Sequence, residues 1–117
     1  MRTITALALL AASLAVLAPT AGADPVANAS KTCSVGDTRS YGTTYVLSIS
    51  VRNTSCRAGR SLIRAFHDCR PGKSGRCARV KGYSCSERRD EGRTQYDSRV
   101  TCRKGDKTVK HTYTQFT

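Results

Sequence analysis

Two histidines in a strongly basic chain are the residues that first suggest a chemical reaction. His67 and His111 are accompanied by 20 Lys and Arg against 8 Asp and Glu, a formal net charge of +12. Cleavage of RNA by general acid–base catalysis needs two titrating groups beside one phosphate, and a cation that stabilises the developing charge. These residue types are present, but no ribonuclease motif surrounds either histidine. A secreted ribonuclease is therefore the least favoured of the functions considered.

Both histidines also have structural explanations. His67 is expected at the end of a helix, where the helix dipole favours a cation. His111 is in phase with Val109 and Tyr113, which predicts a half-buried position in a strand. Serine or cysteine hydrolysis is not indicated, because no G-x-S-x-G motif occurs and a disulfide-bonded cysteine cannot act as a nucleophile. We therefore expect a non-enzymatic protein without a cofactor.

The six cysteines are the second set of chemically distinctive residues. They are Cys33, Cys56, Cys69, Cys77, Cys85 and Cys102. Their even number, together with expected export to an oxidising compartment, favours three disulfides. Zinc sites usually contain closely spaced C-x2-C or H-x3-H pairs, whereas no two of these cysteines are closer than eight positions. We expect no metal site.

The segment between Cys69 and Cys77, if bridged, forms a tight loop that presents Lys73 between two arginines. Some serine-protease inhibitors display a basic residue on such a loop, where rigidity lowers the entropic cost of binding. The other explanation is a stapled turn at the end of a helix, basic like the rest of the chain. A serine-protease inhibitor is the alternative function.

A basic surface is the third feature. It is expected on one helix face and the loop that follows, with Arg57, Arg60, Arg64, Arg70, Lys73 and Arg76 as polyanion-binding residues. Such a patch attracts polyanions, although a solvated face that keeps the protein in solution explains it equally well. The expected partner is an anionic polymer of the cell envelope or an acidic protein. Nucleic acid is not favoured, because the tyrosines are not spaced as a stacking platform.

Residues 1–23 are predicted to be a cleavable signal peptide. Arg2 supplies a positive charge, residues 4–17 are apolar, and residues 19–23 are small ahead of a cut before Asp24. The apolar run is shorter than the roughly 18–20 residues that span a bilayer, and no second run follows. We expect a secreted, extracellular protein without a transmembrane segment after cleavage.

The rest of the chain is expected to be a flexible lead-in, residues 24–32, and one disulfide-rich domain, residues 33–117. Alternation in residues 45–52 predicts a half-buried strand with Tyr45, Leu47, Ile49 and Val51 on one face. A helix is expected from an N-cap in residues 53–55 to about residue 69, before Pro71. Its apolar arc would hold Ala58, Leu62, Ala65, Phe66 and Cys69.

The C-terminal half is expected to supply further strands. Residues 79–86, 99–103 and 108–116 are strand candidates, residues 104–107 a turn, and the charged residues 87–98 an exposed loop. A single helix on one face of a small antiparallel sheet buries both apolar surfaces. The predicted fold class is therefore α+β, stapled by disulfides, and the protein is expected to be a monomer.

Three short motifs give the chain a family resemblance. They are Thr54-Ser55-Cys56 at the helix start, Gly82-Tyr83-Ser84-Cys85, and Cys102 followed by Gly105 and Val109. With these motifs the chain resembles a family of small secreted, cysteine-containing, mostly uncharacterised proteins of high-GC Gram-positive bacteria (actinobacteria). His111 stands where an aromatic residue is usual, and Cys69 with Cys77 is an added pair. The resemblance implies no enzyme activity and no functional residue.

Six cysteines allow fifteen disulfide connectivities, and the sequence alone does not choose among them. Proximity favours Cys69–Cys77, and the resemblance supports it because the other four cysteines are then the family's set. Among those four we expect Cys56–Cys85, which would tie the helix start to the sheet. Cys33–Cys102 would then close the N-terminus.

Overall fold

The computed structural model describes residue 15 and residues 29–117. The predicted signal peptide, residues 1–23, lies outside the described residues except for Ala15, as do residues 24–28 of the expected lead-in. The last residues of that lead-in are part of the sheet, because the first strand begins at Lys31.

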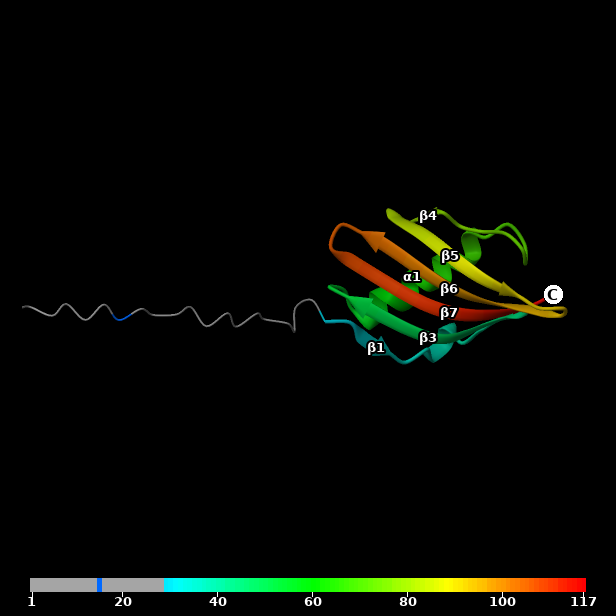
Figure 1. The fold of residues 1–117 in the computed structure, drawn as a ribbon, viewed down its shortest axis with the longest axis horizontal. Helices are drawn as coiled ribbons and strands as arrows, with labels where there is room; N and C mark the ends of the chain where they lie inside the picture. The colour runs from blue at the N-terminus through cyan, green and yellow to red at the C-terminus, as the bar shows by residue number, and fades with distance from the viewer. Residues whose placement is uncertain (1–14, 16–28) are drawn as a thin grey trace, which may run out of the picture.

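An antiparallel sheet with one α-helix on one face makes up the described domain, which confirms the α+β prediction (Figure 1). The helix is α1 (Cys56–Cys69), and a short 3-10 helix, η1, spans Gly36–Thr38. The strands are β1 (Lys31–Cys33), β2 (Ser40–Tyr41), β3 (Thr44–Arg52), β4 (Arg79–Val80), β5 (Tyr83–Glu91), β6 (Gln95–Lys104) and β7 (Lys107–Phe116). Their order is β1-β3-β7-β6-β5-β4, with β2 paired to β3.

The core lies between α1 and the inward face of the sheet. Leu62, Ile63 and Phe66 of the helix are almost fully buried. The strands contribute alternate residues to the same core, namely Val46, Ile49, Val51, Tyr96, Val100, Cys102, Val109 and Tyr113. The opposite face, which we call the open face, carries mainly Ser, Thr, Lys and Arg. Antiparallel sheets commonly have one buried and one solvated face.

The start of β3 has the opposite orientation from the one predicted. Val46 is buried, whereas Tyr45 and Leu47 are 40% and 59% exposed. The register with β7 shifts between Val46 and Ser48, where a β-bulge adds one residue. Because side chains alternate with a period of two, one extra residue reverses which ones face the core. Ile49 and Val51 are buried as predicted.

Helix α1 begins and ends where predicted, but its buried arc is rotated. Ser55 caps it by accepting a hydrogen bond from the backbone N of Ala58 at 3.1 Å. The buried residues include Gly59 and Ile63, whereas the predicted Ala58 and Cys69 are exposed. A Cβ on Gly59 would lie 2.6 Å from Cγ1 of Val51, so the helix approaches β3 through this glycine.

The predicted loop at residues 87–98 is wrong, because these residues form most of a β-hairpin. Strands β5 and β6 pair from Ser84 opposite Arg103 to Glu91 opposite Tyr96. The density of charged residues in this segment suggested exposure to solvent, but Glu87 and Arg89 point inward. Their side chains form an ion pair at 2.9 Å and are only 3% (Glu87) and 6% (Arg89) exposed. A buried charged pair in alternate positions looks like a solvated segment in the sequence.

All six cysteines form disulfides, but only one of the three expected pairs is present. Cys69–Cys77 is found as predicted, together with Cys33–Cys56 and Cys85–Cys102. The expected Cys56–Cys85 and Cys33–Cys102 bridges are wrong. Cys85 lies directly opposite Cys102 in the hairpin that the sequence did not predict. Cys33 lies on β1, three strand positions from Cys102 on β6, or about 14 Å at the usual strand spacing, too far for a bridge.

Candidate functional site

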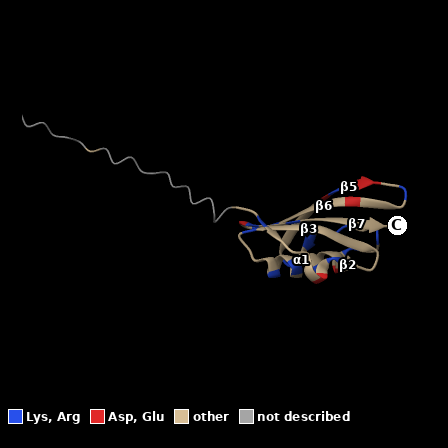
Figure 2. Ribbon diagram, turned by 90° about the horizontal axis from the view of Figure 1, so that it is seen from below, with Lys and Arg blue, Asp and Glu red and all other residues tan. Residues whose placement is uncertain are grey.

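The predicted arginine face of α1 is partly occupied by contacts within the protein. Nη1 of Arg60 donates to the carbonyl oxygen of Ser34 at 3.2 Å, and Arg64 forms an ion pair with Asp37. The hydrogen bond from Arg64 also lowers the pKa of Asp37. Arg57 is exposed. Figure 2 shows basic positions along α1. Two of them, Arg60 and Arg64, hold the segment around η1 against the helix.

The remaining three predicted polyanion-binding residues do not form one surface with the helix arginines. Lys73 is exposed, whereas Arg70 is buried at 8% exposure. Arg76 donates to the carbonyl oxygen of Glu87 at 3.1 Å. The six residues therefore divide between a helix face, a loop and the interior.

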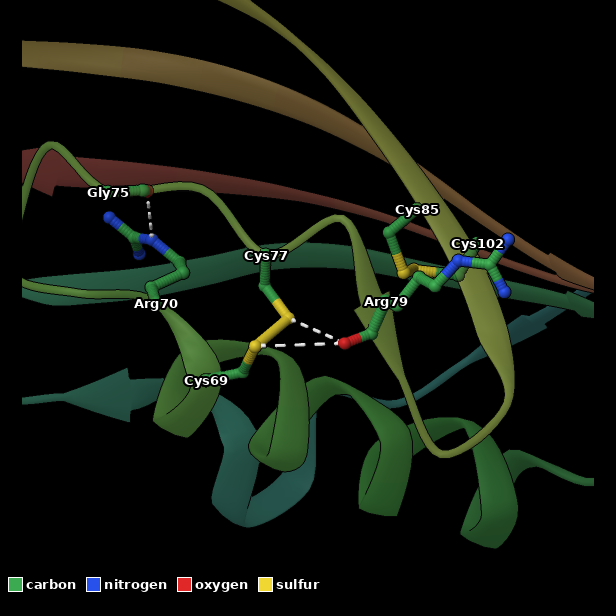
Figure 3. The surroundings of a disulfide bond; sticks show 7 residues. All are labelled: Cys69, Arg70, Gly75, Cys77, Arg79, Cys85 and Cys102. Carbon is green, nitrogen blue, oxygen red and sulfur yellow. Dashed lines mark hydrogen bonds between the residues drawn. A yellow bond between two sulfur atoms is a disulfide. The ribbon is translucent and has the colours of Figure 1, made fainter.

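The Cys69–Cys77 loop folds around the side chain of Arg70 (Figure 3). Arg70 donates through Nε to the carbonyl oxygen of Gly75 at 3.0 Å and through Nη2 to that of Lys73 at 2.6 Å. The hydroxyl of Tyr96 donates to the same Lys73 carbonyl. The loop backbone is therefore fixed from inside, while the side chains of Pro71, Lys73, Ser74 and Arg76 are exposed to solvent.

His67 on α1 and His111 on β7 are in direct contact. Their Nε2 atoms lie 3.1 Å apart, and Nη1 of Arg70 lies 2.9 Å from Nδ1 of His67. A guanidinium can only donate, so His67 carries its hydrogen on Nε2 and donates it to Nε2 of His111. His111 then carries its hydrogen on Nδ1, a buried atom without a hydrogen-bond partner in residues 29–117.

Both imidazoles are neutral at neutral pH. Burial, assisted by the charge of Arg70, lowers the pKa of His67 to about 3. Burial also lowers the pKa of His111 well below its ordinary value, and His67 and Arg70 act in the same direction. The expectation of a cationic His67 is therefore wrong, whereas His111 lies in the strand and is more buried than expected. The structure brings the two histidines together, but without the protonated imidazole that a general acid for RNA cleavage requires.

A second buried group adjoins this pair. Glu87 accepts hydrogen bonds from Arg89, Ser98 and Tyr113. Burial raises the pKa of Glu87, but these three hydrogen bonds outweigh it, so the net shift is downward. Glu87 and Arg89 thus neutralise each other inside the domain.

The open face of the sheet carries many exposed polar side chains. Two adjoining hollows of about 450 and 460 Å³ cross its centre and share Arg99 and Thr101. Polar side chains along them come from β1, β3, β5, β6 and β7, namely Thr32, Ser48, Ser50, Ser86, Arg88, Arg99, Thr101, Lys110 and Thr112. We call this surface the open-face groove.

The charges in the open-face groove are mostly positive. Arg88 and Arg99 lie directly opposite each other on β5 and β6. Lys110 lies opposite Thr101 on the next strand pair. Asp90 lies 3.6 Å from Arg99, and both side chains are exposed by more than two-thirds, which makes this a weak ion pair. The sequence contained a signal for this surface, because cationic and hydroxyl residues alternate with buried ones in β6 and β7. The surface was missed because the β5–β6 hairpin was not predicted, so the two strands were not placed side by side.

An exposed apolar cluster lies at one end of the same face. Tyr45 and Phe116 contact edge to face, with ring centroids 5.7 Å apart, and Leu47 lies beside them. The β3 bulge places Tyr45 and Leu47 on this side.

Comparisons with known proteins identify no relative. No family model matches the chain, and no curated protein or solved structure is similar enough to count as a match. The resemblance to the actinobacterial family stays a prediction. In the part of the chain that the structure describes, no helix is long and apolar enough to span a membrane. Nor does that part contain a group of three or more His, Cys, Asp or Glu placed to hold a metal ion.

Proposed function

We propose that this is a secreted, non-enzymatic protein that binds an anionic polymer of the cell envelope through the open-face groove. The observation that carries the proposal is the pair Arg88 and Arg99, directly opposite each other on adjacent strands. Like charges directly opposite each other destabilise a sheet, and Asp90 supplies Arg99 with only a weak, exposed counter-charge. The groove replaces the helix arginine face as the preferred site, because Arg60 and Arg64 already have partners within the domain.

The chemistry of the groove fits a chain of phosphate or carboxylate groups. Lys110 and Arg99 supply charge, and hydroxyl groups from four strands can donate hydrogen bonds to anionic oxygens. Glu87, whose side chain is buried in the ion pair with Arg89, borders the hollow of about 460 Å³. Among the described residues, no Asp or Glu lines the hollow of about 450 Å³. An extended polyanion can therefore cross several strands without meeting a carboxylate there.

An envelope polymer is favoured over nucleic acid. Binding of single-stranded nucleic acid usually uses aromatic side chains on which successive bases stack. In the described structure the aromatic residues of this face, Tyr45 and Phe116, contact each other at its end. Three disulfides are consistent with an extracellular protein, and the expected signal peptide would deliver it to the envelope.

The proposal is tested by binding of the oxidised protein to long-chain inorganic polyphosphate and to a single-stranded oligonucleotide across a salt series. The test variant is the triple substitution Arg88→Gln, Arg99→Gln and Lys110→Gln. Its matched control removes the same charge from the helix, with Arg57→Gln, Arg60→Gln and Arg64→Gln.

We expect the groove variant to lose roughly 2–3 units of the log–log salt slope, about 0.7–0.9 for each cation that contacts a phosphate. The helix variant should retain most of the slope. The reverse result would place the site on the helix. Failure of the unmodified protein to bind polyphosphate at physiological salt would reject the function, and tighter binding of the oligonucleotide would reject the choice of partner.

Serine-protease inhibition is the second candidate, favoured by the rigid Cys69–Cys77 loop with its exposed Lys73. Two donors fix the Lys73 carbonyl, which lowers the entropy lost on binding. Incubation with trypsin tests it. Stoichiometric inhibition that disappears in Lys73→Ala would support an inhibitor, whereas unaltered trypsin activity would remove this candidate.

A further inference from the structure

A polar cavity of about 250 Å³ lies on the helix side of the sheet, at the C-terminal end of α1. Its walls come from the β2–β3 connection, the helix end, the Cys69–Cys77 loop and β7, and they include Tyr41, Thr43, His67, Arg70, Lys73 and Gln115. Among the described residues, no carboxylate lines it. We propose that this cavity binds the phosphate group of a small phosphate monoester.

Arg70 is the first reason. Its guanidinium is buried, and its five hydrogen bonds go to neutral acceptors: three carbonyl or amide oxygens, the Tyr96 hydroxyl and the His67 imidazole. The buried carboxylate of Glu87 is paired with Arg89 instead. Within residues 29–117 no carboxylate hydrogen-bonds to Arg70, and a buried charge without a counter-charge is costly.

The second reason for proposing a phosphate site is that several donor groups on the cavity walls have hydrogens without an acceptor in the part of the chain that the structure describes. Oε1 of Gln115 accepts from Arg70, which can only donate, so its Nε2 must donate to Oγ1 of Thr43. The Thr43 hydroxyl then has its own hydrogen to offer. The buried hydroxyl of Tyr41 has no partner among the described residues, and burial keeps it protonated by raising its pKa. Nη1 of Arg70 has given one of its two hydrogens to His67.

The walls therefore offer hydrogens and positive charge but little acceptor capacity. Tyr41 and Thr43 come from β2 and the β2–β3 connection, and Arg70 and Lys73 come from the Cys69–Cys77 loop, so the donors approach the cavity from two segments. A tetrahedral phosphate, with three terminal oxygens, accepts from several directions, which a planar carboxylate does less well. The C-terminus of α1 carries a partial negative charge of about half a unit, smaller than the combined charge of Arg70 and Lys73.

This site is independent of the open-face groove, because Arg70 and Gln115 lie on the inward side of the sheet. The test is a titration of the oxidised protein with inorganic phosphate, followed by NMR signals of the Tyr41 and His67 rings, with acetate at the same ionic strength as the comparison. We expect saturable shifts with phosphate and weaker ones with acetate.

The variant Tyr41→Phe removes only the unpartnered hydroxyl and should weaken phosphate binding roughly ten-fold or more, the usual effect of losing a hydrogen bond to a charged group. Tyr45→Phe, on the open face, is the matched control and should bind as the unmodified protein does. The triple groove variant should also bind phosphate normally. No saturation, equal or tighter acetate binding, unchanged binding in Tyr41→Phe, or loss in the groove variant would each overturn the proposal.

Discussion

The His67–His111 contact predicts that the protein loses stability in mild acid. The folded state holds both imidazoles neutral. Protonation of His67 at Nδ1 would place a second cation beside Arg70 and remove the acceptor of its Nη1 hydrogen bond. Protonation of His111 at Nε2 would break the Nε2–Nε2 hydrogen bond. The pKa of His67 falls to about 3 in the folded protein, against about 6.5 in the unfolded chain. A depressed pKa of a base means that the unfolded state binds protons first. The full stability is therefore present above about pH 6.5 and declines as the pH falls from there towards 3.

The size of the effect follows from the shift of one group. At about 1.36 kcal/mol per pKa unit, lowering the pH from about 7.5 to about 5.0 removes about 2 kcal/mol through His67 alone. His111 is shifted in the same direction and adds to the loss. A domain of this size is stable by about 5–15 kcal/mol, so a noticeable fraction disappears. The midpoint temperature should fall by roughly 8–16 °C.

Urea unfolding followed by circular dichroism at several pH values between about 7.5 and 5.0, in buffers free of phosphate, measures this loss. Most carboxylates titrate below this window, so the histidines dominate it. The double variant His67→Gln and His111→Gln is the control and should keep a nearly constant free energy of unfolding over the same range. Unchanged stability of the unmodified protein at pH 5.0, or an equal loss in the double variant, would refute the reasoning.

Three further predictions concern the interior. Glu87→Gln should lower the free energy of unfolding by about 3–5 kcal/mol, because it leaves buried Arg89 without its counter-charge. Asp90→Asn removes only the exposed partner of Arg99 and should change the free energy of unfolding by less than about 1 kcal/mol. Equal losses for the two variants in urea unfolding would contradict this prediction. Gly59→Ala should cost about 1–3 kcal/mol through overlap with Val51, and adding Val51→Ala should make the Gly59 substitution less costly, which a double-mutant cycle checks. Non-reducing peptide mapping should recover Cys85 joined to Cys102, and replacing both by Ser should remove about 2–4 kcal/mol; a Cys56–Cys85 peptide would show that the hairpin register is wrong.

The fold class and the helix could be predicted because their signals are local. The cap at Ser55, the stop before Pro71 and the alternation ending at Phe116 each depend on neighbouring residues. The β5–β6 hairpin could not, since its inward charges at Glu87 and Arg89 are stabilised by Tyr113, on another strand. A buried ion pair can be predicted only when both of its partners and their surroundings in the fold are known.

The errors in the site follow from that one missing hairpin. The pairing of β5 with β6 is what places Cys85 opposite Cys102 and Arg88 opposite Arg99, so neither contact could be predicted without that hairpin. The β3 bulge is a separate case, because a single extra residue leaves the composition of the strand unchanged while reversing Tyr45 and Leu47. The contact between His67 and His111 joins residues 44 positions apart, and only the strand phase of His111 hinted at its burial.

The two outer strands of the sheet bear on how the protein behaves at high concentration. β1 has three residues and forms one short edge. β4 pairs only with Tyr83 and Ser84, so residues 86–91 of β5 form the other edge without a neighbouring strand among the described residues. Cys33 in β1 and Cys77, two residues before β4, are both disulfide-bonded to the helix, which hinders either strand from peeling away. Long unprotected sheet edges are where proteins add one another's strands and aggregate. The β1 edge is short and anchored, and the β5 edge carries charged side chains from Glu87 to Glu91. Both features oppose the addition of a strand from another molecule, so we expect the protein to resist edge-to-edge aggregation at high concentration.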